Sequence, residues 1–483
     1  MFDLKELSSI KEKDIFEGKK AKRELPNAIW ETYSSFANSS GGTIVLGIEE
    51  LKNGCFQICG VEQSDKIVKD FWNTINNKKK VNLNILCNQD VRIETIENKT
   101  IIIIEIPRAA REQKPIYLNN DLFGGTYRRN GEGDYHCSII EIKNMLRDQP
   151  ERTNDFKIVE QFDISVLDKE TIRSYRNLFS VNKPGHTWNT LEDSEFLYRI
   201  SAIEKTHEKT FRPTIAGLLM FGYDYDIERI FPNYFLDYQE KFDNLTRWTS
   251  RLHSDQGDWT GNLFDYFFRV YQYFSASIKT PFLLENNLYR KDDSNLHIAL
   301  REALLNCIGN ADFYNSKGIL INYTPSGIRF ENPGAMRISI QKAIEGGTSD
   351  ARNKAIMKMF GLIGLGEKAG SGVPDIFAIC NDLNLPKPYL HEEYNPDRTY
   401  LEIYIRRGNM HLLERQSLLI SNQEKLVMTY VEDKGSCICK EIEDLLHIKG
   451  TRARVILSQM VKKDLLIARG ANRNRTYICN HNL

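Results

Sequence analysis

Three polar residues recur at helical spacing in an otherwise apolar stretch of the chain. Within residues 296–313, Glu302, Asn306 and Asn310 lie four residues apart, so a helix would place them in one stripe. A carboxylate and two amides are costly to bury unless a partner satisfies them. Mg²⁺ and a nucleotide phosphate would do so, with Asn306 as a metal ligand and Glu302 as the catalytic group that orients a water.

A glycine-rich segment downstream favours the same site. Residues 366–372 read Gly-Glu-Lys-Ala-Gly-Ser-Gly, and a helix-like stretch follows at 373–383. Glycines before a helix let backbone N–H groups approach phosphates at the positive helix end. Taken alone, such a loop is also explained by an ordinary turn.

The order of these elements resembles the Bergerat-type (GHKL) ATP-binding fold. The phrases REALLNCIGNADF, FENPGAM, GGTSDARN and GEKAGSGVPDI resemble more closely the divergent ATP-binding domain of bacterial Schlafen-related transcriptional regulators, over roughly residues 160 to 407. Where the wider superfamily has an Asp in its adenine-binding turn, this chain has Glu331-Asn332-Pro333-Gly334, so the resemblance implies nucleotide binding more firmly than ATP hydrolysis. The nucleotide-binding residues predicted on this basis are Asn306, Asn310, Asp312, Asn332, Gly334, Gly366, Gly370 and Gly372.

Carboxylates near the N-terminus form a second candidate site. Glu12, Glu17 and Lys19 precede the first predicted helix, and Glu50 follows a predicted strand at 43–48. In an extended segment Glu17 and Lys19 share one face. Three carboxylates brought together would hold a divalent metal beside a phosphodiester, with Lys19 neutralising the phosphate. Spacing alone is explained better by solvated surface charges.

The same region resembles the Schlafen-type AlbA domain over residues 1–150. The resemblance rests on E-x4-E-x-K, on FANSSGGTIVLGI at 36–48 and on YRRNG at 127–131. It implies nucleic-acid binding and, as in eukaryotic Schlafens, RNA cleavage by Glu12, Glu17 and a later acid, for which Glu50 stands where that family has Asp. The basic residues expected to contact phosphates here are Lys19, Lys20, Lys22, Arg23, Lys78, Lys79, Lys80, Arg128 and Arg129.

The last part of the chain, 417–483, has the pattern of a winged helix. Three helices are predicted at 422–432, 439–446 and 451–463, followed by two short strands around a wing at 470–475. Residues 449–483 contain eight basic residues and one acid, whereas 422–448 contain six acids and three bases. This contrast favours DNA or RNA over a protein partner, which is the common alternative for this fold. The candidate contacts are Lys449, Arg452, Arg454, Arg469, Arg473 and Arg475.

The elements that position these residues predict a multidomain α/β and α+β protein. Strands are expected at 43–48, 91–96 and 100–106, and a helix at 138–147. The predicted order is an AlbA-like domain (1–150), a mixed α/β connector (151–290), a GHKL-like α/β sandwich (291–408) and the winged helix (417–483). In the connector, the run 214–222 indicates a core segment whose glycines serve packing.

Length and composition limit the remaining possibilities. A chain of 483 residues favours two to four domains, and 41% hydrophobic with 27% charged residues is typical of globular proteins. The formal net charge is zero, so only the local distribution of charge is informative. The charged N-terminus and the short apolar runs predict a cytoplasmic protein with no membrane partner. Nine cysteines without paired C-x-x-C motifs argue against a zinc site.

These patterns predict a nucleotide-responsive nucleic-acid-binding protein, a transcriptional regulator with ATP and Mg²⁺ as cofactors. Nucleotide binding is expected to shift a lid at residues 335–365 and so bias the domains that hold nucleic acid. Two alternatives stay open: a Schlafen-like metal-dependent endoribonuclease, and a scaffold of interaction modules without catalysis. The sequence does not decide between monomer and homo-oligomer, and it does not identify the target nucleic acid.

Overall fold

The computed structural model divides the chain into two compact units, Met1–Ile403 and Tyr404–Leu483. It describes residues 15–51, 56–96, 98–131, 133–242, 248–277, 284–285, 289–290, 295–366, 370–394, 396–405, 426–428, 430–431, 434–446, 449–462, 466–469 and 475–479. Within these ranges, no helix is both long enough and apolar enough to cross a membrane.

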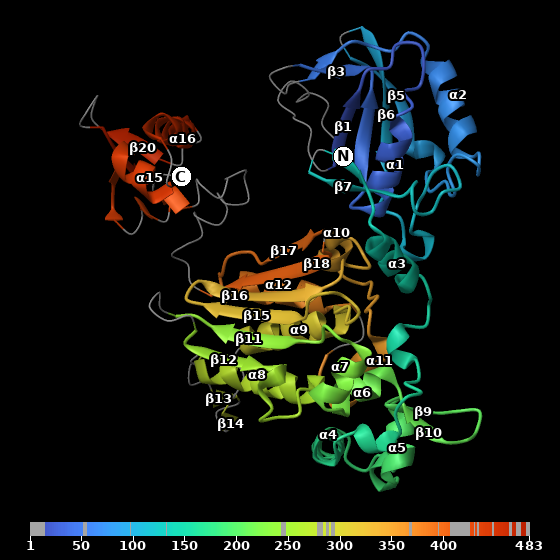
Figure 1. The fold of residues 1–483 in the computed structure, drawn as a ribbon, viewed down its shortest axis with the longest axis vertical. Coiled ribbons are helices and arrows are strands. Elements are labelled where there is room, and N and C mark those ends of the chain that lie inside the picture. Colours follow the sequence, from blue (N-terminus) through green and yellow to red (C-terminus); the bar gives the residue numbers. More distant parts are fainter. Residues whose placement is uncertain are drawn as a thin grey trace. The chain divides into compact units, whose positions relative to one another are not determined.

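A four-stranded sheet forms the centre of the N-terminal domain (Figure 1). Its order is β1 (Phe16–Lys19), β2 (Gly42–Leu46), β6 (Lys99–Ile106) and β5 (Val91–Ile96), with β1 parallel to β2 and the other pairs antiparallel. The run of four isoleucines in β6 is buried on both faces. Ile102 and Ile104 pack with α1 (Ile29–Asn38) and α2 (Ser64–Ile75), whereas Ile101 and Ile103 belong to a second cluster on the opposite face. Because both faces of β6 are covered, the strand is apolar throughout instead of alternating between apolar and polar residues.

Two hairpins and a helix complete this domain. The first hairpin pairs β3 (Ile48–Glu50) with β4 (Phe56–Ile58), and the second pairs β7 (Tyr127–Asn130) with β8 (Gly133–His136). Ser138 caps α3 (Ile139–Asp148) by accepting from the backbone N–H of Glu141. The helix therefore starts one residue later than predicted, and its last residue, Asp148, faces the second half of the unit.

Short elements then connect the two halves of the unit. They are η3 (Arg111–Gln113), which precedes the hairpin β7–β8, and α4 (Lys169–Asn182), α5 (Asp193–Arg199), β9 (Ile203–Lys205), β10 (Phe211–Pro213), α6 (Ile215–Phe221) and α7 (Asp224–Ile230), which follow α3. Every residue of α6 is buried, as expected for a core segment. A Cβ on Gly217 would lie 1.8 Å from the carbonyl oxygen of Ala202. This glycine therefore serves close packing.

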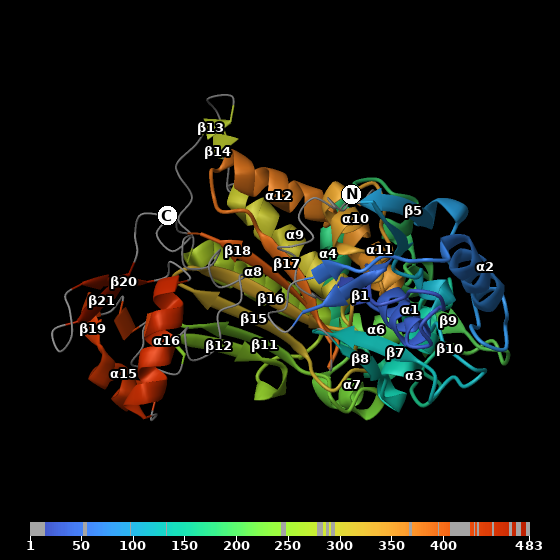
Figure 2. The same ribbon diagram turned by 90° about the horizontal axis from the view of Figure 1, so that it is seen from above.

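A six-stranded sheet with helices on one face forms the second half of the unit (Figures 1 and 2). Its order is β12 (Ser250–His253), β11 (Leu236–Glu240), β15 (Ile319–Thr324), β16 (Gly327–Pro333), β18 (Arg398–Tyr404) and β17 (Tyr389–Glu393). In β15, Ile319, Ile321 and Tyr323 are buried and the residues between them are partly exposed. This alternation is typical of a two-layer sandwich.

Helices α8 (Leu263–Ser277), α9 (Asn295–Asn310) and α12 (Gly372–Asp382) form the helical layer. The chain between β16 and α12 contains α10 (Ile340–Glu345) and α11 (Lys354–Leu362). The sheet takes β11 and β12 from the stretch that the sequence assigned to a connector, so the sandwich begins well before residue 291. The short hairpin β13 (Leu284–Glu285) and β14 (Tyr289–Arg290) precedes α9.

The C-terminal unit has its own small core. A three-stranded sheet of order β19 (Cys437–Ile438), β21 (Thr476–Cys479) and β20 (Leu466–Arg469) accompanies α15 (Cys439–Leu446) and α16 (Gly450–Lys462). The buried side of α16 includes Ala453, Ile456, Leu457 and Met460. Val455 of the same helix is 46% exposed. The predicted wing at 470–475 lies outside the described residues except for Arg475, so the winged helix stays a prediction.

Candidate functional site

The polar stripe of α9 lines a pocket between the helical layer and the sheet. Glu302, Asn306 and Asn310 face it together with Gly370 and Gly372. The pocket, called the α9 pocket below, holds about 950 Å³ of empty space, part of it open to solvent. The structure thus brings together the helix and the glycine-rich segment that the sequence placed in one site.

Hydrogen bonds along the stripe orient its amides. The Nδ2 of Asn306 donates to Oε1 of Glu302 at 3.1 Å and to the Glu302 carbonyl at 2.9 Å. The Nδ2 of Asn310 donates in the same way to the Asn306 carbonyl at 2.9 Å. With Nδ2 used as the donor, Oδ1 is the atom with which Asn306 can ligate a cation. A carboxylate and an amide oxygen are ligands that Mg²⁺ accepts.

Glycine at position 372 permits the close approach of α12 to this stripe. A Cβ there would lie 2.2 Å from Oε1 of Glu302 and 2.8 Å from Nδ2 of Asn306. At Gly370, where φ is +71°, a Cβ would lie 2.8 Å from the carbonyl oxygen of Thr348. Both glycines therefore keep backbone, rather than side chains, at the pocket wall beside the start of a helix.

Strand alternation decides which residue of the Glu331-Asn332-Pro333-Gly334 turn reaches the pocket. Phe330 and Asn332 line the α9 pocket, whereas Glu331 points to the other face of the sheet and pairs with Arg398 at 3.4 Å. Burial raises the pKa of Glu331, against the effect of Arg398. The polar side chain that this turn presents to the pocket is thus an amide, which can both donate and accept hydrogen bonds.

Three of the predicted nucleotide-binding residues do not line this pocket. Asp312 and Gly334 line a separate cavity, described below. Gly366 is also absent from the described lining. A Cβ on Gly334 would lie 1.9 Å from Nη1 of Arg352. This glycine makes room for an arginine, not for a ligand in the α9 pocket.

The N-terminal carboxylates are not assembled into a metal site among the described residues. Glu12 lies outside them. Glu17 accepts from Lys19 through Oε1 and from Arg129 through Oε2, both at 2.9 Å, whereas Glu50 is exposed at the end of β3. No group of three or more His, Cys, Asp or Glu side chains in the described ranges has the geometry to hold a metal ion. Glu17 and Lys19 do share one face of β1, as predicted.

Arg128 and Arg129, predicted to contact nucleic acid, are instead buried in ion pairs. Arg128 is 6% exposed and pairs with Asp397, and Arg129 is 3% exposed and bridges Glu17 and Asp134. A phosphate could replace these partners only by breaking buried pairs, which is costly. The other predicted cations include six that are exposed, namely Lys20, Lys22, Arg23, Lys78, Lys79 and Lys80. Of these, Lys20 pairs with Glu49 and Arg23 with Glu62.

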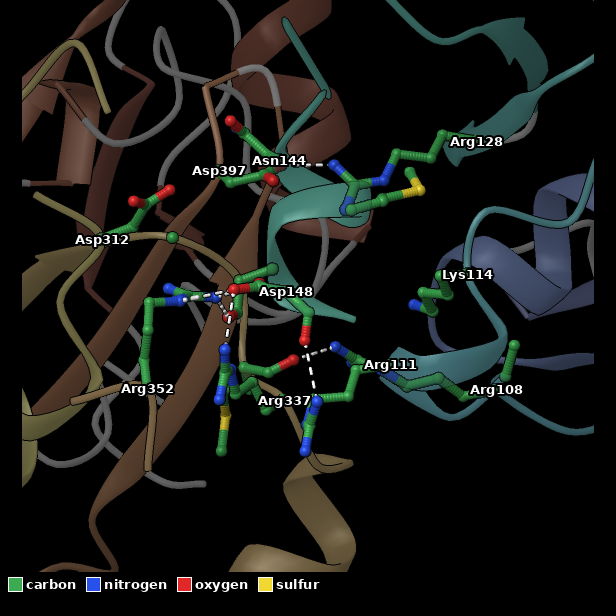
Figure 3. A pocket seen from close by; sticks show the side chains of 15 residues that line it. Arg108, Arg111, Lys114, Arg128, Asn144, Asp148, Asp312, Arg337, Arg352 and Asp397 are labelled. Carbon is green, nitrogen blue, oxygen red and sulfur yellow. Dashed lines mark hydrogen bonds and ion pairs between the residues drawn. The ribbon is translucent and has the colours of Figure 1, made fainter. Parts of the chain in front are cut away.

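Ion pairs join the N-terminal domain to the wall of the α9 pocket (Figure 3). Asp148 accepts from Arg352 at 2.7 Å and from Arg337 at 3.0 Å. Burial opposes ionisation of Asp148, but the two arginines outweigh it and lower its pKa to about 2. Arg111 of η3 pairs with Asp350 at 2.5 Å. Arg337 and Asp350 also line the α9 pocket, so one segment, residues 335–352, contacts both.

This connection was not predicted from the sequence. Asp148 reads as an ordinary charged residue at the end of a helix, and Arg111 as one of many surface cations. The phrase GGTSDARN marked the 346–353 stretch only as part of a family pattern. These charged residues differ from surface charges only in being buried, and spacing along the chain does not reveal burial.

In the C-terminal unit, the described basic residues are accessible. Lys449, Arg452 and Arg454 are exposed near the start of α16, and Arg469 and Arg475 are exposed where β20 ends and β21 begins. No carboxylate of a described residue lies within ion-pair distance of these five. They therefore remain available to an anionic partner. Arg473 lies outside the described residues.

Comparison with family models divides the chain into three matched regions. Residues 6–138 match the model described as Schlafen, AlbA_2. Residues 143–237 match a domain of unknown function, DUF8451. Residues 317–398 match the model described as "Putative ATP-dependent DNA helicase recG C-terminal". No curated protein matches the chain.

Two solved structures resemble the chain. The crystal structure of the DIP2311 protein from Corynebacterium diphtheriae is 17% identical, with 99% of this chain and 93% of that one covered and a TM-score of 0.41. The solution NMR structure of the N-terminal domain of a RecG-related protein from Nitrosomonas europaea, titled a "putative ATP-dependent DNA helicase", is 27% identical. It covers 28% of this chain and 91% of its own, with a TM-score of 0.22. Neither score indicates a shared arrangement of the whole chain.

The two family matches to known domains agree with the two halves of the larger unit. The AlbA_2 match covers the four-stranded sheet with its helices and hairpins, and the 317–398 match covers β15, β16 and the residues up to the start of β18. The chain therefore contains a Schlafen AlbA_2 domain followed by a GHKL-like, ATPase-type region.

Proposed function

We propose that this chain is a nucleotide-responsive nucleic-acid-binding protein that acts as a transcriptional regulator. The observation that carries the proposal is the 335–352 segment, which lines the α9 pocket and is ion-paired to Arg111 of the AlbA_2 domain and to Asp148 at the end of α3. The family matches support it, because one domain type is named for Schlafen AlbA proteins and the other for an ATP-dependent DNA helicase.

The α9 pocket fits Mg-ATP by the chemistry of its donors. Glu302 and Asn306 offer oxygen ligands, Asn332 offers an amide to a nucleotide base, and Gly372 lets the start of α12 approach the polar stripe closely. Bound Mg²⁺ would neutralise the phosphate charge and fix the phosphates in place. Asn306 would hold the metal through Oδ1, Glu302 would position a water, and the start of α12 would face the phosphates.

The effect of nucleotide binding in the α9 pocket is transmitted to the AlbA_2 domain through the 335–352 segment. A ligand can shift a conformational equilibrium only if it contacts the two states differently. Thr348, Ser349 and Asp350 lie at the pocket wall, and Asp350 is held by Arg111 of the AlbA_2 domain. A phosphate close to Asp350 repels its carboxylate, so nucleotide binding changes the pairing with Arg111. This is the proposed route of the response.

Nucleic acid is bound by exposed cations in two places. In the AlbA_2 domain these are Lys78, Lys79 and Lys80, which follow α2. In the C-terminal unit, α15, α16 and the β20–β21 hairpin support a winged helix, with Arg452 and Arg454 on the exposed side of the presumed recognition helix, α16. Contacts of this kind give salt-dependent affinity.

The experiment that tests the nucleotide site is isothermal titration of the full chain with a nonhydrolysable ATP analogue and Mg²⁺. Asn306→Ala is expected to weaken binding about tenfold or more, because it removes a metal ligand. Asn73→Ala, on the exposed side of α2, is the matched control and should leave the affinity unchanged. Failure of the wild-type protein to bind, or equal binding by both variants, would overturn the nucleotide assignment.

A further inference from the structure

A second cavity lies between the AlbA_2 domain and the ATPase-type domain, separate from the α9 pocket. It holds about 490 Å³ of empty space, part of it open, and its wall comes from both domains (Figure 3). Six of its lining side chains are cationic and three are carboxylates. The cations are Arg108, Arg111, Lys114, Arg128, Arg337 and Arg352, and the carboxylates are Asp148, Asp312 and Asp397.

The carboxylates near this cavity leave one lining cation without an ion pair. Arg337 and Arg352 share Asp148, and Arg337 also lies 3.9 Å from Asp350. Lys114 is 8% exposed, and its Nζ donates to the backbone carbonyl of Asn38 at 2.6 Å. No carboxylate of a described residue lies within ion-pair distance of Lys114. A buried cation without a counter-charge is costly, and a bound anion would remove that cost.

Two buried donors on the cavity wall also lack a partner. The Nε atoms of Arg128 and Arg337 are inaccessible to solvent and make no hydrogen bond. The side chain of Arg337 is 3% exposed and that of Arg128 is 7% exposed. Leaving a buried N–H without a hydrogen-bond partner costs more free energy when it belongs to a charged group than when it belongs to a neutral group. Arg128 and Arg337 therefore each keep an unsatisfied donor beside the cavity.

We propose that this interdomain cavity binds the phosphate group of a small phosphorylated ligand. A phosphate fits better than a carboxylate, because its oxygens can accept from donors that converge from several directions. Lys114 and Arg128 come from the AlbA_2 domain and Arg337 from the ATPase-type domain, so a bound phosphate holds the two domains together. Arg337 lines both this cavity and the α9 pocket, so occupancy of one site affects the affinity of the other.

Protonation of Lys114 is linked to this binding. Burial, with Arg108 and Arg128 adding to it, lowers the pKa of Lys114 well below its usual value, while Glu392 and Asp397 act in the opposite direction. A phosphate beside Nζ stabilises the ammonium form and raises that pKa. Protonation of Lys114 on binding is therefore expected to take up a proton from the buffer, and a Lys114→Met variant should lack this uptake.

Titration calorimetry of the full chain tests the site with two probes, orthophosphate and glucose 6-phosphate. Saturable binding of orthophosphate assigns the site to the free ion, and a clear preference for glucose 6-phosphate assigns it to a phosphate ester; either result supports the proposal. Repeating the titration in buffers of different ionisation enthalpy measures the proton uptake. No saturable binding of either probe would overturn the proposal.

Variants locate the binding. Asn144→Asp adds a negative charge at the cavity wall and keeps the acceptor that Arg147 uses, so it is expected to fold and to weaken phosphate binding roughly tenfold. Lys114→Met should weaken binding and remove the proton uptake. Lys69→Met, an exposed cation of α2, is the control. Phosphate affinity unchanged by Asn144→Asp, or reduced as much by Lys69→Met, contradicts the assignment. Asn306→Ala is expected to leave it unchanged, whether or not the α9 pocket binds nucleotide.

Discussion

Arg352 donates two hydrogen bonds to Asp148, from Nε to Oδ1 at 3.2 Å and from Nη2 to Oδ2 at 2.7 Å. This bidentate pair joins the last residue of α3, the helix that follows the AlbA_2 match, to the segment that lines the α9 pocket. Arg352 also donates to the carbonyl of Asn310, at the end of the polar stripe on α9. One arginine thus links the end of α3 to the end of the polar stripe on α9.

Removing the charge of Asp148 is expected to destabilise the protein. In Asp148→Asn, Arg337 and Arg352 stay buried without their shared carboxylate, which costs about 2–3 kcal/mol because a fifth of the Asp148 side chain is still exposed. Urea unfolding of the full chain measures the loss. Asp258→Asn, at an exposed position, is the control. Equal stability of the two variants would show that the pairing contributes little.

The ion pairs of Asp148 are also expected to make the free energy of unfolding fall at acid pH. The pKa of Asp148 is lowered from 3.8 to about 2 in the folded protein, so its contribution is present above pH 3.8 and is lost as the pH falls through about 2. Wild-type stability should therefore fall more steeply than that of Asp148→Asn over this window. Unfolding curves at several pH values compare the two, and parallel curves would contradict the low pKa.

Gly372→Ala is expected to abolish nucleotide binding. The added Cβ would collide with Glu302 and Asn306, so α12 must move away from the polar stripe. Calorimetric titration with the ATP analogue and Mg²⁺ measures the loss, and thermal unfolding of the unliganded protein shows whether the fold is kept. Wild-type affinity in this variant would remove the start of α12 from the site.

The AlbA_2 domain is expected to bind RNA without cleaving it. Both oxygens of Glu17 are held by cations, Lys19 and Arg129, which makes this carboxylate a poor metal ligand. Structured RNA incubated with Mn²⁺ or Mg²⁺ should stay intact, and Glu17→Gln should behave as the wild type. Metal-dependent cleavage that disappears in Glu17→Gln would favour the endoribonuclease alternative instead.

Arginines on α16 are expected to set the salt dependence of nucleic-acid binding. Replacing both Arg452 and Arg454 by Ala removes about two phosphate contacts, so the slope of log affinity against log salt should decrease by about 2. Gel-shift titrations at several salt concentrations measure it. Lys434→Ala is the control, because Lys434 is already paired with Glu441. An unchanged slope in the double variant would make this unit a protein-interaction module.

Local sequence patterns were sufficient for the elements that carry strong periodicity. The predicted strand at 91–96 and helix at 439–446 coincide with β5 and α15, because alternating and helical apolar spacing determine these elements directly. The short strand β19 and the helix α2 were missed. In α2, Ile67, Phe71 and Ile75 form a clear buried face at spacing four, a signal that was present in the sequence.

Contacts between residues far apart in the sequence could not be predicted from spacing along the chain. The stripe Glu302–Asn306–Asn310 could be found because its members lie on one helix. The burial of Arg128 against Asp397 joins residues 269 positions apart, and nothing in YRRNG distinguishes a buried arginine from a surface one. The same holds for Asp148 and Arg352, whose pairing depends on how two domains meet.

The most direct test of the account is the affinity of the full chain for nucleic acid, measured by fluorescence anisotropy with and without saturating ATP analogue and Mg²⁺. The account predicts that the nucleotide changes this affinity, about 5-fold or more for a typical coupling between sites. It also predicts that the Arg111→Met variant, which lacks the ion pair with Asp350, still binds the nucleotide but that its affinity for nucleic acid no longer depends on the nucleotide. The same affinity with and without bound nucleotide would contradict the account.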